Sequence, residues 1–532
     1  MDQQPETQSE VPSVDGLSRR TLLTAAAAST IALALPGAAR APGASAGRSR
    51  PAIKPFSRPL PIPRVLTDAD LTIPMREAEV SILPGRKTRM WTYDGSFPGP
   101  TIRRPTGQRT RVRFEHRLPR EAGELSIHLH GGHNRCTEDG HPGGLTATQP
   151  ASLYCDIAPG LSDAESGNDL LIFPGGARTY HYDLMEDGAQ ERASMQWYHD
   201  HRLDRTARNI WRGLAGMWIL DDEFEASLPL PRGSRDIPLM LADRSFDARN
   251  QLTKPYPERR PPNDGIMGER ILVNGAVLPQ HRVRPLRYRI RVLNASQFRS
   301  YDLRLSGGLP MIQIATDAGL MPQPVRRSRI LIGPGERVEF IVDFAAARGR
   351  SVRLLSGRRP GGPTSRGSVT FNGPLMEFGV LSRREPDRTS VPPVLRPLPG
   401  WVAEASPTPS HVWRVGIGGG LRPRWLINGR PFDPTYADVT AKVGETVTWE
   451  LHNPTAVAHL LHLHQTDWYM LSRNGRRPPP WEACLKDTFF MDPRDRVVIA
   501  GRLSDHKGKF VMHCHMLDHE DHGLMSQFEV VA

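Results

Sequence analysis

The chain has 532 residues and a formal net charge of +12, and Gly and Pro supply 48 and 50 of its residues. Glycine without a period of three excludes a collagen-like chain, and proline throughout the sequence excludes a long coiled coil. The length predicts about three domains, and the basic residues are interleaved with acids along the whole chain, so their excess does not predict a nucleic-acid partner.

The first 41 residues have the pattern of an export signal. The paired Arg19 and Arg20 follow a polar start and precede an Ala/Leu-rich run that ends at about Leu35. This run of about 15 residues is shorter than the ~20 needed to span a bilayer, and paired arginines before such a run are typical of twin-arginine signals. We therefore expect residues 1–41 to be a signal peptide and residues 42–65 a flexible lead-in.

This signal predicts where the protein works. We expect the chain to be recognised by the twin-arginine export machinery and to reach the periplasm, the cell envelope or the extracellular space. That route carries folded proteins, which suits a chain that takes up a cofactor before crossing. After cleavage of the signal, the sequence predicts no integral membrane segment.

Three similar segments divide the rest of the chain. Each has a Gly-containing turn that leads into a short strand of alternating residues, and they lie about 150–180 residues apart. Short β-rich runs between Gly, Pro, Asn and Asp turns are typical of sandwiches or barrels, and long amphipathic helical stretches are scarce. The sequence therefore predicts an all-β chain of three β-sandwich domains, at 66–225, 226–383 and 411–532, with an interdomain linker at 384–410.

Four clusters of histidine indicate the chemistry. On a strand, side chains two positions apart share a face, so each His-x-His pair presents two imidazoles to one side. One such pair has little specificity, but four clusters from opposite ends of the chain predict a metal centre. The clusters are His128 and His130; His199 and His201; His459, His462 and His464; and His513, Cys514, His515 and His519.

The last cluster indicates which metal is bound. His513 and His515 face one side of the strand and Cys514 faces the other, so they can serve two different sites. A thiolate with two imidazoles is the ligand set of a trigonal blue-copper centre, for which His459 and His519 are available. The eight remaining histidines suit a multinuclear copper cluster, because zinc would not explain a cysteine placed between two cluster ligands.

These four motifs, in this order and spacing, resemble those of the three-domain multicopper oxidases, and most closely the bacterial laccases of the spore-coat, bilirubin-oxidase and phenoxazinone-synthase type. The resemblance covers most of residues 66–532. It implies three cupredoxin-like Greek-key β-sandwich domains that hold four copper ions. It also implies one-electron oxidation of a small aromatic reductant, such as a phenol or aminophenol, coupled to four-electron reduction of O2 to water.

The resemblance also implies a role for each ligand. The type 1 copper, which accepts electrons from the substrate, corresponds to His459, Cys514 and His519. The type 2 copper corresponds to His128 and His462. The type 3 pair, where O2 binds, corresponds to His130, His199, His201, His464, His513 and His515.

Two carboxylates and one leucine complete the predicted site. Glu520 and Asp139 match positions where similar enzymes place carboxylates near the O2 site. Each acid either supplies protons to O2 or only orients an imidazole, and the sequence leaves both roles open. Five residues after the last type 1 histidine, where this group commonly has an axial methionine, the chain has Leu524, and Met525 is expected to face the other way. We therefore expect no axial ligand.

Two other functions compete with this interpretation. One is a metal-ion oxidase acting on Cu(I) or Mn(II), although the chain has no Met-rich segment of the kind that gathers Cu(I). The other is a copper-binding envelope protein without catalysis, which would not need a cysteine between two cluster histidines. Among the remaining cysteines, Cys136 and Cys155 can pair in an exported protein, but the sequence does not fix that pairing, and it predicts no role for Cys484.

Overall fold

The structure is a computed structural model, and it describes residues 53–143, 155, 170–253, 265–359, 370–419 and 424–532. The predicted signal peptide, 1–41, and the first part of the predicted lead-in lie outside these ranges. All described residues belong to one compact unit, Ser49–Ala532. Within the described ranges, no helix is both long and apolar enough to cross a bilayer.

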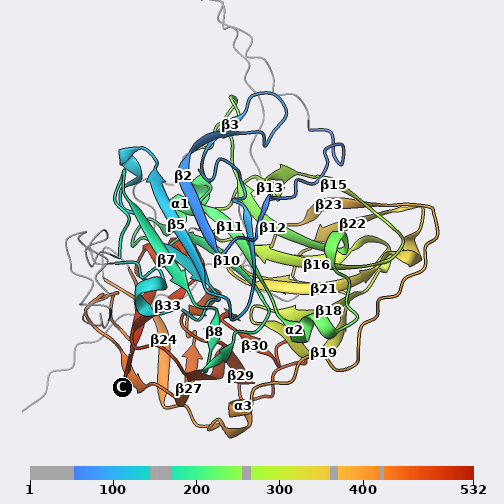
Figure 1. The fold of residues 1–532 in the computed structure, drawn as a ribbon. Helices are drawn as coiled ribbons and strands as arrows, with labels where there is room; N and C mark the ends of the chain where they lie inside the picture. The colour runs from blue at the N-terminus through green and yellow to red at the C-terminus, as the bar shows by residue number, and fades with distance from the viewer. Residues whose placement is uncertain (1–52, 144–154, 156–169, 254–264, 360–369, 420–423) are drawn as a thin grey trace, which may run out of the picture. The chain divides into compact units, whose positions relative to one another are not determined.

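Strands dominate the described chain and form three pairs of sheets, each drawn from one stretch of sequence (Figure 1). The first pair comes from the N-terminal stretch, in which inward Val112 and Phe114 alternate with outward arginines along β5. One sheet has the order β1 (Val65–Leu66), β4 (Thr101–Pro105), β11 (Ala215–Asp221), β10 (Met195–Asp200), β6 (Ile127–His130). The other has the order β3 (Thr88–Tyr93), β2 (Asp70–Val80), β5 (Thr110–Arg117), β7 (Ala177–Tyr182), and β8 (Met185–Glu186) pairs with β9 (Ala189–Gln190).

The second pair of sheets encloses its own apolar core, which includes Ile290, Phe340 and Leu354. The larger sheet has the order β14 (Ala276–Val277), β13 (Arg270–Val273), β12 (Asp236–Arg244), β16 (Arg287–Asn294), β21 (Arg337–Asp343), β18 (Met311–Thr316), β19 (Gly319–Arg327). The smaller sheet has the order β15 (Gln280–Val283), β23 (Gly373–Val380), β22 (Ser351–Ser356), β17 (Tyr301–Leu305), β20 (Ile330–Ile332).

The third pair comes from the C-terminal stretch and packs around Trp413, Trp449 and Trp468, which are fully buried. One sheet has the order β25 (Arg424–Ile427), β24 (His411–Gly418), β27 (Glu445–His452), β32 (Arg496–Leu503), β29 (Trp468–Arg473), β30 (Leu485–Lys486). The other has the order β26 (Val439–Lys442), β34 (Met525–Val531), β33 (Gly508–Cys514), β28 (His459–Leu463), β31 (Thr488–Met491).

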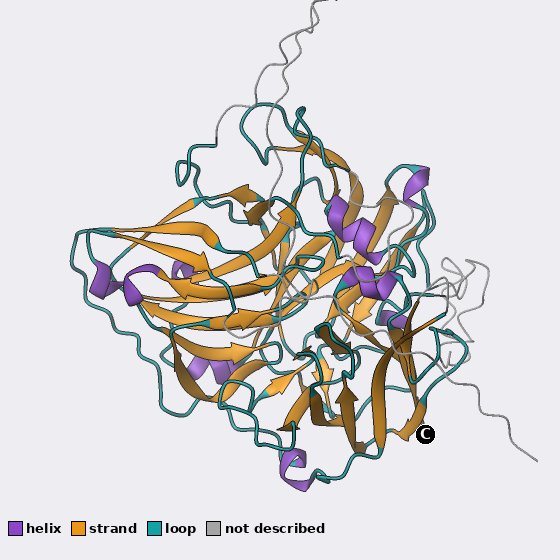
Figure 2. Ribbon diagram, turned by 180° about the vertical axis from the view of Figure 1, so that it is seen from behind, coloured by secondary structure: helices purple, strands orange, loops and turns teal. Residues whose placement is uncertain are grey.

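Helices in the described chain are few and short, as Figure 2 shows from behind. They are α1 (Thr206–Arg212), α2 (Glu223–Ser227), α3 (Trp401–Glu404) and α4 (Leu517–Asp521). The α4 helix connects β33 to β34 and lies against α1 from the N-terminal stretch. The prediction of an all-β chain is confirmed.

Two connecting segments are more firmly packed than their composition predicts. Residues 53–65 belong to the predicted flexible lead-in, yet the backbone N–H of Leu60 donates to the carbonyl of Gln280, 2.8 Å away, and the Leu60 side chain is buried. The predicted linker 384–410 contains no strand, and Leu395 is buried along it. Backbone hydrogen bonds and single apolar anchors therefore fix stretches whose proline content favours an irregular path.

Candidate metal centres

Strands β6 and β10 bring the first two histidine pairs together. Their antiparallel pairing places His199 directly opposite His128. Opposite residues on antiparallel strands share a face of the sheet. His130 ends β6 and His201 follows the end of β10, so four imidazoles gather at one edge, and all four are buried.

Strands β28 and β33 make the matching arrangement at the other end of the chain. They are antiparallel, with His462 opposite His513 and Leu461 opposite Cys514. Because side chains alternate along a strand, His513 and Cys514 point to opposite faces of this sheet. Cys514 is the last residue of β33 and His459 is the first residue of β28.

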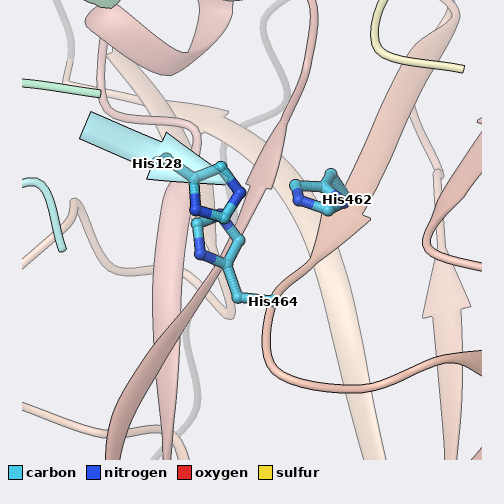
Figure 3. A group of neighbouring side chains, drawn as sticks. All are labelled: His128, His462 and His464. Atoms are coloured by element: carbon cyan, nitrogen blue, oxygen red, sulfur yellow. The ribbon is translucent and has the colours of Figure 1, made fainter. Parts of the chain in front are cut away.

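The imidazoles from both ends of the chain meet in one buried group. We call it the histidine cluster: His128, His130, His199, His201, His462, His464, His513 and His515. The ring centroids of His128 and His464 are 3.8 Å apart, and those of His130 and His462 are 3.7 Å apart. Figure 3 shows His128 with its ring against that of His464, and His462 beside them. The structure thus brings the predicted imidazoles from both ends of the chain into one group.

Three imidazole nitrogens of the cluster converge at one point. The Nε2 atoms of His201 and His464 lie 3.1 and 3.3 Å from Nε2 of His513. Burial lowers the pKa of all three well below the usual value, so the rings are neutral and each carries one N–H. His464 uses its N–H at Nδ1, which donates to Asp139 at 2.7 Å. A cation shared by these three nitrogens would fit their convergence.

Other cluster histidines have one nitrogen bonded outward and one aimed inward. His128 Nδ1 donates to the backbone carbonyl of Asp139 at 2.5 Å, and His462 Nδ1 donates to that of Asp487 at 2.9 Å. His199 Nδ1 donates in the same way to the residue that follows it. The Nε2 atoms of these three rings are buried and have no hydrogen-bond partner. A hydrogen bond at one nitrogen fixes the tautomer that leaves the other free to bind a metal.

The last pair of the cluster is His130 and His515. Nε2 of His130 lies 3.2 Å from Oδ1 of Asp487, so its unbonded Nδ1 is the nitrogen left for a metal. Both ring nitrogens of His515 are buried without a hydrogen-bond partner, and its ring centroid is 4.9 Å from that of His130. Buried nitrogens without partners are costly, and metal ions would satisfy them.

A separate group lies on the other face of β33. We call it the cysteine site: His459, Cys514 and His519. The Sγ atom of Cys514 lies 3.6 Å from Nδ1 of each histidine, and the two Nδ1 atoms are 3.2 Å apart. Burial raises the pKa of Cys514 to about 12 and lowers that of His459 to about 3. A copper ion in place of the thiol proton fits this His₂Cys set.

Apolar and aromatic side chains surround the cysteine site. Trp425 lies 4.8 and 4.5 Å from the two imidazole rings, and Phe298 lies 5.3 Å from the second, measured between ring centroids. Leu524 packs in the same core as Cys514, whereas Met525 packs in a separate group of apolar residues. The opposite orientations expected for Leu524 and Met525 agree with this packing.

The two predicted carboxylates both touch the histidine cluster. Asp139 accepts from His464 through its carboxylate, and its backbone carbonyl accepts from a second cluster ring. Glu520 lies in α4 with Oε2 2.9 Å from Nδ1 of His513 and Oε1 3.8 Å from Nδ1 of His201. Burial raises the pKa of both acids above the ordinary range for a carboxyl group.

Sequence reasoning missed Asp487 and Arg337. The Arg337 guanidinium, from β21 in the second pair of sheets, holds both oxygens of Asp487 at 2.7 and 2.6 Å. Asp487 in turn contacts His130 through its carboxylate and His462 through its carbonyl. The middle stretch thus orients cluster histidines without supplying one. A lone acid and one of many arginines carry no spacing signal that would have indicated this.

The remaining cysteines have distinct states. Cys136 and Cys155 form a disulfide, the pairing that the sequence left open. Cys136 begins a short 3-10 helix, Cys136–Glu138, that leads directly to Asp139. Cys484 is a buried free thiol near the hydroxyl of Thr316, 3.4 Å away.

Comparison with known proteins places these sites in a family. Sequence models of the multicopper oxidase family match residues 75–154 and 405–532. A laccase of Haloferax volcanii is 33% identical over 96% of this chain and 91% of its own length, and bilirubin oxidase of Albifimbria verrucaria is 32% identical over 83% and 72%. A solved laccase of Pediococcus acidilactici superposes with a TM-score of 0.74 at 29% identity, covering 91% of this chain and 95% of that one.

These matches span all three pairs of sheets and include both metal-binding groups. The likeness to solved multicopper oxidases also confirms the expected cupredoxin-like architecture. The chain therefore belongs to the multicopper oxidase family, and it is a copper-dependent, laccase-like oxidoreductase.

Proposed function

We propose that the chain binds four copper ions through the two groups. The cysteine site holds the type 1 ion, and His128 and His462 hold the type 2 ion. His201, His464 and His513 hold one type 3 ion, and His130, His199 and His515 hold the other. The converging nitrogens and the unpartnered buried nitrogens support this division.

The proposed reaction oxidises phenols, aminophenols or related small aromatic reductants and reduces O2 to water. Copper supplies one-electron transfer at the cysteine site and O2 binding at the histidine cluster. The protein supplies the connection between them, because Cys514 is covalently joined through the backbone to His513 and His515. This connection is the observation that carries the proposal, since a storage protein does not need it.

Protons for the reaction come from the carboxylates at the cluster. Reduction of O2 to two waters consumes four protons, which must reach a buried group. Glu520 and Asp139 are both buried, and both contact cluster imidazoles. We propose that Glu520 passes protons toward O2, because its carboxylate has one oxygen facing each of two cluster rings. Asp139 holds its imidazoles in place through hydrogen bonds to two rings.

We also propose the predicted domain bounds and export route. Apart from Val65, the first residue of β1, each pair of sheets falls within one of the stretches 66–225, 226–383 and 411–532, which supports three domains. The paired arginines and the apolar run support twin-arginine export to the periplasm, the envelope or the extracellular space. Replacing Arg19 and Arg20 by lysine should leave the protein in the cytoplasm of an expressing cell. Export of this variant at the wild-type level would exclude the twin-arginine route.

O2 uptake by the copper-loaded enzyme tests the proposed activity. Phenols, aminophenols, bilirubin, Cu(I) and Mn(II) are supplied in turn under steady-state conditions. We expect O2 consumption with the aromatic reductants, at one O2 for every four electrons donated. Uptake with Cu(I) or Mn(II) alone would instead make the protein a metal-ion oxidase, and no uptake with any reductant would contradict an oxidase.

A further inference from the structure

Another histidine of the N-terminal stretch lies outside the histidine cluster and faces acids. His133 follows β6 and is 6% exposed. Three carboxylates surround its ring: Glu191 Oε1 is 3.4 Å from Nδ1, and Glu186 Oε1 and Asp467 Oδ2 are 3.7 and 4.0 Å from Nε2. Neither ring nitrogen has a hydrogen-bond partner. We call these four residues the His133 site.

The ring of His133 is held so that one nitrogen faces two carboxylates. Glu191 lies on the Nδ1 side, and it also accepts from the amide of Gln196, which fixes its position. A carboxylate beside Nδ1 favours a proton on that nitrogen. Against the effect of burial, the three facing carboxylates raise the pKa of His133 well above its usual value, so in the absence of a cation Nε2 is protonated as well. A divalent cation would replace the proton on Nε2, and the lone pair freed in this way would face Glu186 and Asp467.

On the Nε2 side, each of the two carboxylate oxygens is close enough to the imidazole nitrogen to share one ion with it. Two atoms that each lie about 2.1 Å from an ion can be at most about 4.2 Å apart. The separations of 3.7 and 4.0 Å fall below this limit, and they are too long for hydrogen bonds. We propose that His133, Glu186 and Asp467 bind a divalent first-row cation, oriented through Glu191. Two carboxylates and one imidazole suit Mn2+ far better than Cu(I).

The local charges support a cation here. Two arginines that interact electrostatically with Asp467 make their hydrogen bonds elsewhere. Arg337 is bidentate to the cluster acid Asp487, and Arg192 donates to backbone carbonyls. Burial and the neighbouring acids raise the pKa of Asp467 to about 8. Without a cation, the site must therefore keep extra protons to limit repulsion among its carboxylates.

The ion would join two distant parts of the chain. Glu186 lies in the β8–β9 hairpin of the N-terminal stretch, and Asp467 lies immediately before β29 of the C-terminal stretch. The side chain of Glu186 is 14% exposed, which gives the ion a route from solvent. A cation there would tie the hairpin to the segment that follows His464 in the cluster.

Binding of Mn2+ to the copper-loaded enzyme tests this proposal. The electron paramagnetic resonance signal measures free Mn2+, so its decrease gives the amount bound. Because the copper sites are filled, this Mn2+ is bound outside them. We expect one Mn2+ per chain in the wild type. Asp467→Asn and Glu186→Gln should each weaken binding at least tenfold. Asp183→Asn is the matched control, since Asp183 pairs with Arg109 and Arg135 outside the site, and it should bind as the wild type does.

Copper content and blue absorption of each variant show whether it has folded. If one variant fails to fold, the other decides, because Glu186 and Asp467 are on different segments. The proposal would be overturned if the wild type bound no Mn2+. It would also be overturned if the folded variants bound Mn2+ as tightly as the wild type. Oxidase activity is measured separately, so failure of the cation site is distinguishable from failure of the proposed activity.

Discussion

The cysteine site and the histidine cluster lie on opposite faces of one strand, yet their surroundings differ in kind. The cysteine site contacts the rings of Trp425 and Phe298. The cluster contacts Asp139, Asp487 and Glu520. An apolar shell suits a centre that only exchanges electrons, whereas carboxylates suit one that also consumes protons. The environment of each group therefore matches the half-reaction proposed for it.

The largest expected effect comes from replacing Cys514. This residue belongs to the cysteine site, and the backbone joins it to two histidines of the cluster. Cys514→Ser should abolish the intense blue absorption at about 600 nm, because thiolate-to-copper charge transfer produces it. Oxidase turnover should be lost with the colour. A variant that keeps both would contradict the assignment of Cys514.

Breaking only the cluster should separate colour from turnover. His464→Ala removes a nitrogen that faces His513 Nε2 at 3.3 Å, on the far side of β33 from the thiol. We expect the blue absorption to remain and to bleach with an aromatic reductant, while O2 uptake falls to background. Normal O2 uptake by this variant would exclude the shared cluster.

A smaller loss is expected when the cluster keeps its metals but loses an acid. Glu520→Gln preserves the shape of the side chain and removes its proton. Because general acid catalysis contributes about 10²–10⁴-fold, kcat should fall by that order. Anaerobic reduction of the blue centre should keep its wild-type rate. Equal loss in both steps would mean that Glu520 only supports the fold.

Replacing Arg337, which lies in the middle stretch of the chain, should lower the free energy of unfolding. Arg337→Met leaves the buried Asp487 carboxylate without its arginine partner, which costs about 3–5 kcal/mol of unfolding free energy. Arg359→Met is the control, since Arg359 and Asp492 form a partly exposed pair that is worth about 1 kcal/mol or less. Thermal unfolding of both copper-loaded variants measures the difference. Equal shifts in Tm would contradict the role given to Arg337.

The smallest effect tunes the cysteine site alone. A thioether donates to copper and favours Cu(II), so Leu524→Met should lower the reduction potential. The swap conserves volume and should cost under ~1.5 kcal/mol. A fall of the reduction potential on the order of 59 mV corresponds to a factor of ten in equilibrium constant. It should slow the oxidation of poorly reducing phenols most. If Met525→Leu shifts the potential and Leu524→Met does not, Met525 is the axial ligand.

The sequence predicted the parts of this comparison that depend on local spacing. His-x-His pairs and strand alternation placed His513 and Cys514 on opposite faces, and the same rule separated Leu524 from Met525. It could not predict Arg337 and Asp487, whose contact joins residues far apart in the chain. The His133 site was equally hidden, because its acids come from two distant segments and share no motif. Tertiary contacts also hold residues 53–65, whose composition predicts a flexible chain.

Anomalous diffraction at the copper edge, from crystals of the copper-loaded protein, tests the division into two sites most directly. We predict four copper peaks: one bounded by His459, Cys514 and His519, and three among the eight cluster histidines. The two groups of peaks should lie on opposite faces of β33. A copper-loaded crystal with no peak at Cys514, or with fewer than three peaks in the cluster, would contradict the assignment.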